Sequence, residues 1–166
     1  MAKKEKIILG LSTAGSRIKA ALKSGEDKFR IKAVKEFNQE KVFFGIIEKL
    51  LSHEKAGLKN IDGICVIKGP GRFTGLRIAL TFASIMKSLT GLKVFTVTAF
   101  EVLAFQAFEN LDFKAWSAKV KNPKIAVILH AFKKEYFLQV FKPKAGLPAA
   151  AGKAQWLSEE DVKRRV

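Results

Sequence analysis

The fold is decided by the stretch Ile61-Asp62-Gly63-Ile64-Cys65-Val66-Ile67-Lys68-Gly69-Pro70-Gly71-Arg72-Phe73-Thr74-Gly75-Leu76-Arg77. Its largely apolar first part, residues 61–67, predicts a central strand that is covered on both faces. A glycine-rich turn at 69–71 then leads into a helix predicted over 73–90, which Gly91 ends. This stretch therefore predicts a buried strand that enters a helix through a tight turn.

The segments on either side extend this pattern of strands and helices. Upstream, apolar periodicity predicts three strands in series at 7–11, 17–22 and 29–37, followed by a helix at 38–56. Downstream, the sequence predicts one more strand and one more helix, at 94–98 and 99–111. A meander that feeds alternating strands and helices predicts an α/β fold, a mixed five-stranded sheet with three helices packed on it.

Two residues are expected to set the ends of the helix predicted at 38–56. Asn38 is a good N-cap residue, and Gly57 can take the left-handed conformation that follows many helices.

The rest of the chain predicts a smaller second part. A lysine-rich linker at 119–123 precedes a β-hairpin, a loop and a short terminal helix that a capping box begins. The segments are the strands 125–129 and 136–141, the loop 143–152 and the box at 158–161. We expect a first lobe over residues 1–118 and an incomplete second lobe over residues 119–166.

The chain is strongly basic. Its 166 residues carry a formal net charge of +16, which favours anionic partners such as nucleic acid. Residues 112–166 hold +7 of this charge and residues 1–111 hold +9, so it does not form a single basic arm. A generally basic, solvated surface and a nucleic-acid footprint both remain open as interpretations.

Composition also bears on location. The hydrophobic fraction of 48% is enough for a core, but no apolar run approaches the roughly 20 residues that cross a bilayer. Cys65 is the single cysteine and is predicted to be a buried small hydrophobe. We expect a cytoplasmic protein that does not engage a membrane.

The sequence holds few candidates for bond-making chemistry. Its two histidines, His53 and His130, form no zinc-binding pattern, and the Gly-x-Ser-x-Gly elbow of α/β-hydrolases is missing. The glycine-rich loop lacks the spacing of a Walker motif. It is either a tight turn or a weak anion contact, to which Lys68, Arg72 and Arg77 would add positive charge. We expect no catalytic residue, no metal and no cofactor.

Three segments resemble motifs of the TsaB family. Residues 69–79 read Gly-Pro-Gly-Arg-Phe-Thr-Gly-Leu-Arg-Ile-Ala, which differs at two positions from the family's Gly-Pro-Gly-Ser-Phe-Thr-Gly-Leu-Arg-Ile-Gly. Residues 97–104 resemble its Val-Ser-Ser-Leu-Glu-Ala-Leu-Ala, and residues 8–13 resemble its Ile-Leu-Ala-Leu-Asp-Thr. The pattern of elements matches over about residues 7–116. The motif loop consists of Gly69, Pro70, Gly71, Phe73, Thr74 and Gly75.

The chain also departs from the family. Ser12 stands where the family usually has Asp, the first phosphate-loop carboxylate of actin-like ATPases. Asn38-Gln39-Glu40 replaces a frequent His-Ser-Glu, and the region 130–137 matches only loosely. The chain is similar to a divergent, C-terminally short member.

The resemblance implies an actin-like (ribonuclease-H-like) fold without catalysis of its own. TsaB-like proteins pair through their first two helices with TsaD, the related subunit that carries metal and transfers the threonylcarbamoyl group to tRNA. A TsaE-like ATPase joins that assembly. The resemblance therefore implies a scaffold subunit that reaches tRNA through the complex, and a homodimer is also possible.

The two helices at 38–56 and 73–90 carry more apolar surface than one sheet can bury, which often marks a partner site. Repacking around an incomplete second lobe would also explain this surplus. The expected interface residues are Phe43, Phe44, Ile47, Leu51, Arg77, Leu80, Ala83 and Ser84.

Two other functions stay open. One is an actin-like nucleotide-binding ATPase, against which Ser12 and the missing Walker spacing count. The other is a stand-alone RNA-binding module that uses the +16 charge. An older label of the family, glycoprotease, finds no nucleophile–base pair in this sequence.

Overall fold

The computed structural model describes residues 5–26, 28–36 and 38–165. The last residue of the strand predicted at 29–37 lies outside these described residues. The chain divides into two compact units, Met1–Val97 and Thr98–Val166. This division lies before the third predicted helix, whereas the sequence places the boundary after residue 118, because that helix packs on strands of the second unit.

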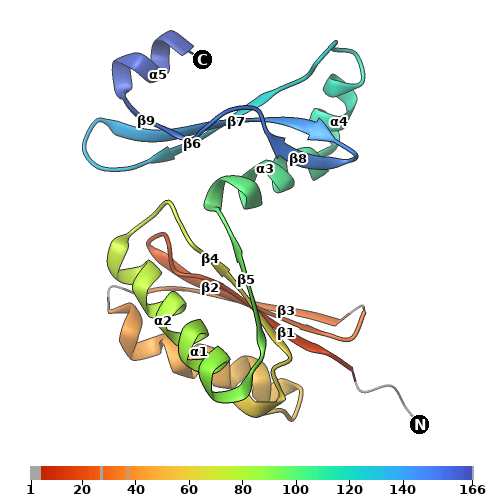
Figure 1. The fold of residues 1–166 in the computed structure, drawn as a ribbon, viewed down its shortest axis with the longest axis vertical. Helices are drawn as coiled ribbons and strands as arrows, with labels where there is room; N and C mark the ends of the chain where they lie inside the picture. The colour runs from red at the N-terminus through yellow and green to blue at the C-terminus, as the bar shows by residue number, and fades with distance from the viewer. Residues whose placement is uncertain (1–4, 27, 37, 166) are drawn as a thin grey trace. The chain divides into compact units, whose positions relative to one another are not determined.

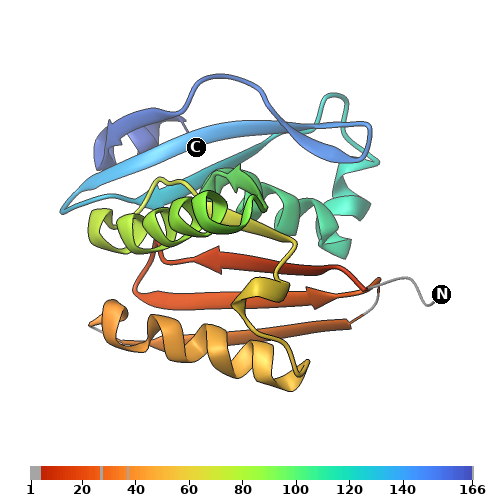
Figure 2. The same ribbon diagram turned by 60° about the horizontal axis from the view of Figure 1, so that its bottom comes forward.

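The first unit contains the mixed sheet that the sequence predicts. The sheet has five strands in the order β3-β2-β1-β4-β5. β1, β2 and β3 form an antiparallel meander, and β4 and β5 run parallel to β1. Figure 2 shows the three meander strands side by side in red to orange. The strands are β1 (Ile7–Ser12), β2 (Arg17–Ser24), β3 (Lys28–Lys35), β4 (Gly63–Ile67) and β5 (Lys93–Val97).

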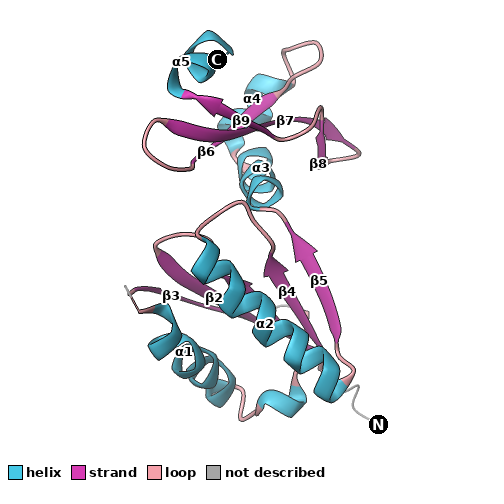
Figure 3. Ribbon diagram, turned by 60° about the vertical axis from the view of Figure 1, so that its left-hand side comes forward, coloured by secondary structure: helices cyan, strands magenta, loops and turns pink. Residues whose placement is uncertain are grey.

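Two long helices cover one face of this sheet (Figures 1 and 3). α1 (Gln39–His53) packs on β2 and β3, and α2 (Phe73–Thr90) packs on β1, β4 and β5. A short 3-10 helix, η1 (Leu58–Asn60), lies between α1 and β4. Both crossovers therefore bring their helices to the same side.

Strand periodicity decides which side chains meet these helices. On β1, Leu9 and Leu11 point to the covered face and are almost completely buried, and so are Ile64 and Val66 beside them on β4. Each side chain of this size contributes about 1.5–3 kcal/mol on burial. The helix residues of the same core are Phe43, Ile46, Ile47, Leu50, Leu51, Ala79, Phe82, Ala83 and Met86.

The helix ends confirm one expectation and correct two. Gly91 follows α2 in the left-handed conformation, with φ of 69°, as predicted. Asn38 occupies the N-cap position of α1, but its side chain makes no capping hydrogen bond. Gly57 does not end α1, because the helix stops at His53 and Lys55 takes the left-handed conformation instead.

The second unit is a four-stranded antiparallel sheet with three helices. α3 (Ala99–Glu109) packs on β6, β7 and β8, and α5 (Glu159–Arg165) packs on β7 and β9. Its core consists of Phe100, Ala104, Phe108, Val127 and Phe141. The remaining elements are α4 (Leu111–Ser117), β6 (Ile125–His130), β7 (Glu135–Lys144), β8 (Leu147–Ala150) and β9 (Gln155–Ser158).

The predicted hairpin and terminal helix are present in this unit. Ser158 accepts a hydrogen bond from the backbone N–H of Asp161, which confirms the capping residue of α5. The segment 143–152 is not only a loop, because β8 pairs with the end of β7. The helix α4 and the strand β9 were not predicted from the sequence. No helix in the described part of the chain is long and apolar enough to cross a membrane.

Candidate functional site

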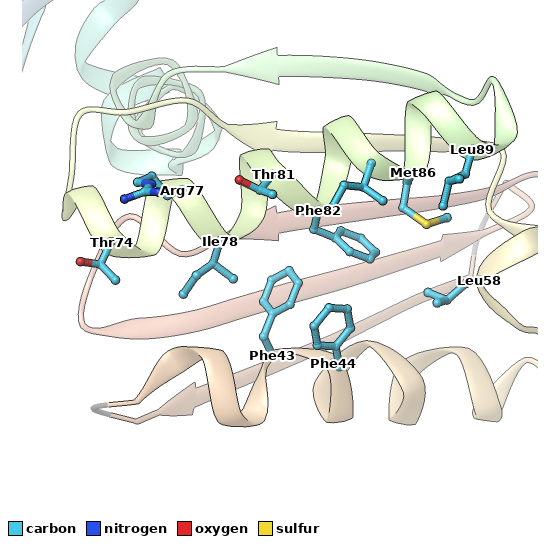
Figure 4. Close-up of a pocket in the computed structure, with 11 residues that line it drawn as sticks. Phe43, Phe44, Leu58, Thr74, Arg77, Ile78, Thr81, Phe82, Met86 and Leu89 are labelled. Carbon is cyan, nitrogen blue, oxygen red and sulfur yellow. The ribbon is translucent and has the colours of Figure 1, made fainter.

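An apolar groove of about 540 Å³ runs between α1 and α2 on the surface of the first unit. Figure 4 shows Phe43 and Phe44 on α1 facing Phe82 and Met86 on α2. The lining residues of the groove are Phe43, Phe44, Leu58, Thr74, Arg77, Ile78, Thr81, Phe82, Ile85, Met86 and Leu89.

Three phenylalanine rings join the two helices at this groove, with Phe43 and Phe82 at its buried floor and Phe44 at its rim. The centroid of Phe43 lies 5.4 Å from that of Phe82, and the centroid of Phe44 lies 5.9 Å from that of Phe82. All the pairs meet edge to face, including Phe43 with Phe44 at 5.5 Å. Such pairs contribute about 0.5–1.5 kcal/mol each beyond the burial of their area. The floor of the groove is therefore a rigid part of the core.

The rim of the groove is apolar and open to solvent. The exposed fractions of Phe44, Ile85 and Leu89 are 55%, 51% and 76%. Single exposed apolar side chains are ordinary, but these three lie around one continuous groove with a buried aromatic floor. The arrangement fits apolar side chains of a second molecule, for which the rim would act as the contact and the floor as the support.

Arg77 alone is charged among the described residues that line the groove. Its guanidinium carbon lies 5.5 Å from the centroid of the Phe73 ring, one turn earlier on the same helix. A cation held over an aromatic ring loses little mobility on binding, because its position is already restricted. Arg77 can therefore select a partner that carries a carboxylate next to its apolar surface.

The start of α2 is fixed to the turn between β1 and β2. The hydroxyl of Thr13 donates to the carbonyl oxygen of Gly75 at 2.6 Å, and the N–H of Arg72 donates to the carbonyl oxygen of Ala14 at 2.7 Å. From α1, Gln39 donates to the carbonyl oxygen of Gly15 at 3.0 Å. These contacts hold both helices of the groove against the same turn.

The glycines of the motif loop make this packing possible. A Cβ atom on Gly75 would lie 2.0 Å from the carbonyl oxygen of Thr13, and one on Gly71 would lie 2.5 Å from that of Ala14. Neither distance is compatible with a side chain, so the two backbones can approach only at glycine. Gly69 and Pro70 are joined by a cis peptide bond at the beginning of the loop.

The three candidate anion contacts lie around this loop. Arg72 is the N-cap residue of α2, and its backbone N–H already bonds to Ala14. The backbone N–H of Lys68 donates to the carbonyl oxygen of Val97, and its side chain is exposed. Arg77 lies on the rim of the groove. A role of these three side chains in binding an anion stays a prediction.

The expected interface residues separate into three groups. Phe44, Arg77 and Ser84 are exposed on α1 and α2. Leu80 is half-buried against the core of the first unit. The other four are buried in the core and support the helices, and Phe43 among them forms part of the groove floor: Phe43, Ile47, Leu51 and Ala83.

The structure adds rim residues that the sequence reasoning left out. Ile78, Ile85 and Leu89 form one row along α2 at helical spacing, and they line the groove together with Leu58 of η1. The spacing of this row was visible in the sequence. Its exposure was not, because the apolar residues of α2 occupy more than one stripe and periodicity alone does not tell which stripe faces the sheet.

Cys65 lies on β4 and is half-buried. Burial raises the pKa of its thiol, which keeps the sulfur protonated and unreactive at neutral pH. Within the described ranges, no group of three or more His, Cys, Asp or Glu side chains could hold a metal ion.

The chain is similar to proteins of known families. Residues 36–152 match the family model of TsaD, described as tRNA N6-adenosine threonylcarbamoyltransferase. A protein of Buchnera aphidicola subsp. Schizaphis graminum, named tRNA threonylcarbamoyladenosine biosynthesis protein TsaB, is 31% identical over 86 residues, which are 52% of this chain and 37% of that protein. The protein of the same name from Haemophilus influenzae is 26% identical over 102 residues, or 61% and 43% of the two chains. These matches therefore span about two fifths of the length of the curated relatives.

Two solved structures share the fold. One is described as an uncharacterized protein with similarity to peptidase YEAZ from Pseudomonas aeruginosa, and the other as YeaZ from Pseudomonas aeruginosa. Each is 21% identical, with a TM-score of 0.77 over 92% of this chain, and the match covers 67% and 68% of those chains. Together with the strand order of the first unit, this likeness confirms the α/β, actin-like fold expected from the sequence.

Proposed function

Because this chain belongs to the TsaD family of tRNA N6-adenosine threonylcarbamoyltransferase domains and is a TsaB-type protein, we propose that it is a non-catalytic subunit of the machinery that forms threonylcarbamoyladenosine in tRNA. In this proposal it docks through the α1–α2 groove on a TsaD-type catalytic subunit in the cytoplasm. A TsaE-like ATPase joins the complex, and the chain meets tRNA as part of that assembly.

The exposed apolar groove between α1 and α2 is the observation that carries the proposal. Its aromatic floor is fixed by core packing, while Phe44, Ile85 and Leu89 present apolar surface to solvent. Rigid aromatic and aliphatic anchors around a pocket are typical of the residues that dominate binding energy in protein interfaces. The matching surface would be an amphipathic helix that places apolar side chains in the groove.

Two features of the phosphate-loop region support a scaffold role rather than ATP hydrolysis. Ser12 offers a hydroxyl at the position where the sequence resemblance implies a carboxylate. The loop at 69–75 is in direct backbone contact with Thr13 and Ala14, so protein atoms fill the space between the two turns. ATP turnover by the purified chain alone would contradict this part of the proposal.

The test is co-expression with the TsaD-type subunit of the same cell, followed by size-exclusion chromatography with light scattering and a titration of affinity. Leu89→Asp places a charge on the exposed rim without disturbing the core, because the side chain is 76% exposed. We expect it to weaken docking by about 30-fold or more, the effect of losing a hot-spot contact.

Leu111→Asp is the matched control, because Leu111 is 79% exposed and lies on α4 in the second unit. It should leave docking unchanged. Equal docking by wild type and Leu89→Asp would overturn the assignment of the groove. A wild-type chain that forms only a homodimer, which Leu89→Asp dissolves, would identify a second copy as the occupant and overturn the choice of partner.

A further inference from the structure

The face of the five-stranded sheet opposite α1 and α2 carries no helix from the described residues of the first unit. Figure 3 shows both helices in front of the strands. Strand pairing identifies the side chains of the open face, because neighbours in register share a face. One row across the sheet is Phe29–Lys23–Ile8–Gly63–Lys93, and the next is Ile31–Ala21–Gly10–Cys65–Phe95.

The charges on this face have one sign. Its strands present five basic side chains and, among the described strand residues that point this way, none that is acidic. Arg17 lies directly opposite Lys35 in the register of β2 and β3. Like charges directly opposite each other destabilise a sheet, and a bound anion would relieve the repulsion. The five side chains are Arg17, Lys19, Lys23, Lys35 and Lys93.

Two exposed phenylalanines lie on the edge strands of the same face. Phe29 on β3 is 62% exposed and Phe95 on β5 is 54% exposed. The strands are about 4.8 Å apart, so the two edge strands are separated by roughly 19 Å. The Nζ atom of Lys23 lies 5.1 Å from the centroid of the Phe29 ring, which places a cation directly beside an aromatic surface.

The middle of the second row is small, whereas Lys23 and Ile8 follow Phe29 in the first row. Ala21, Gly10 and Cys65 separate Ile31 from Phe95 in the second row, and Gly63 lies in the first row beside Ile8. A Cβ atom on Gly63 would lie only 3.1 Å from Cδ1 of Ile8. The centre of the second row is therefore a low floor between Ile31 and Phe95 on the two edge strands.

We propose that this open sheet face binds single-stranded nucleic acid. Unpaired bases stack on Phe29 and Phe95, since base–aromatic stacking tolerates any base, and the cations of β2 and the adjacent strand ends contact phosphates. The uniform positive charge favours a polyanion over an apolar protein surface or a second copy of this equally basic chain. The inference goes beyond the proposed function and does not rest on it, because the docking groove lies on the other side of the sheet.

The test uses the full chain alone, without a TsaD-type subunit. Binding of a fluorescein-labelled, single-stranded 12-nucleotide RNA is measured by fluorescence anisotropy at several salt concentrations. The RNA duplex and the single-stranded DNA of the same sequence are measured in the same way for comparison. We expect the single strands to bind more tightly than the duplex, with affinity that falls as salt rises. Tighter binding of RNA than of DNA would indicate contact with the 2′-hydroxyl.

Two matched comparisons decide the location. Phe29→Ala should weaken binding about tenfold, whereas Phe132→Ala, at a position 65% exposed in the second unit, should not. Arg17→Glu with Lys19→Glu should reduce the slope of log affinity against log salt by about 1.4, the value for two phosphate contacts on a single strand. Lys41→Glu with Lys49→Glu on α1 changes the net charge by the same amount. This control pair should reduce the slope of log affinity against log salt by less.

Circular dichroism and thermal unfolding of each variant show that the fold is intact. Equal losses in the two charge variants would mean that only the overall charge attracts RNA and would overturn the assignment of the face. Salt-independent or undetectable binding by the wild-type chain would overturn the proposal as a whole. Failure to bind a TsaD-type subunit has no bearing on this measurement, so the two proposals can fail separately.

Discussion

The hydroxyl of Thr13 donates a hydrogen bond of 2.6 Å to the carbonyl oxygen of Gly75, across 62 residues of sequence. Thr13 directly follows β1 and is fully buried, and Gly75 lies in the first turn of α2. This bond and the close backbone approach at Gly75 fix where α2 begins. The position of one wall of the docking groove therefore depends on a contact with the central strand.

Removing this hydrogen bond should destabilise the first unit. Thr13→Val keeps the size of the side chain but removes this hydrogen bond to a carbonyl that also belongs to the helix ladder of α2, which costs about 0.5–1.5 kcal/mol. Urea denaturation measures the loss. Thr96→Val changes an exposed threonine of β5 and should stay within about 0.5 kcal/mol of wild type. Equal stability of the two variants would contradict a structural role of the bond.

Two glycine substitutions should have opposite signs. Gly75→Ala places a Cβ atom 2.0 Å from the carbonyl oxygen of Thr13 and should cost about 1–3 kcal/mol or more through overpacking. Gly45→Ala adds its Cβ to open space on α1 and should stabilise the chain by about 0.5–1 kcal/mol. Thermal unfolding of both variants checks the pair. A neutral Gly75→Ala would show that the motif loop has room for a side chain.

Substitution of Phe82 should mainly lower stability, whereas substitution of Phe44 should mainly weaken docking. Phe82 is 6% exposed, so Phe82→Ala should cost about 3–5 kcal/mol of unfolding free energy. Phe44 is 55% exposed, so Phe44→Ala should cost about 1 kcal/mol or less while still weakening association with a TsaD-type subunit. Chemical denaturation and affinity measured on the same samples compare the effects. A Phe44→Ala chain that docks normally would count against the rim as the contact surface.

The thiol of Cys65 should react slowly at neutral pH. Because burial raises its pKa, a thiol reagent should modify the folded chain faster only as the pH rises above the ordinary cysteine range. The chain unfolded in guanidinium chloride is the control and should react at lower pH. The Cys65 thiol loses its proton at lower pH in the unfolded chain than in the folded chain. Its contribution to stability therefore falls as the pH rises from the pKa of the unfolded state towards the pKa of the folded state. The pH at which thiol modification reaches half its maximal rate is compared for the folded and unfolded chains. A value for the folded chain at or below that for the unfolded chain would contradict the burial argument.

Local patterns were sufficient for much of the first unit. Apolar patterns predicted the strands β1 and β2, and the glycines of the motif loop predicted a tight connection between β4 and α2. Patterns were not sufficient at the end of α1. Gly57 is a good helix terminator by itself, yet α1 ends at His53, before the short helix η1 and the entry to β4.

The second unit also contains elements that local sequence patterns did not predict. β8 lies in a segment rich in proline, alanine and glycine, and its strand conformation comes from pairing with the end of β7 rather than from its own residues. α4 begins at the capping side chain of Asn110, which accepts from the N–H groups of Asp112 and Phe113. That capping signal was present in the sequence, but the helix is too short for periodicity to reveal it.

The order of strands and long helices in the first unit, the identity of the motif loop and the basic character of the chain followed from the sequence alone, because each depends on residues that are neighbours along the chain. Which apolar rows of α1 and α2 are core and which are rim was decided only in the tertiary structure. Phe43 and Phe44 are adjacent in sequence and both contact Phe82 of α2, but Phe43 is buried in the core and Phe44 is exposed at the rim. The reason is physical: a helix with apolar residues on several stripes is buried on whichever stripe its neighbours cover, and those neighbours come from distant parts of the chain.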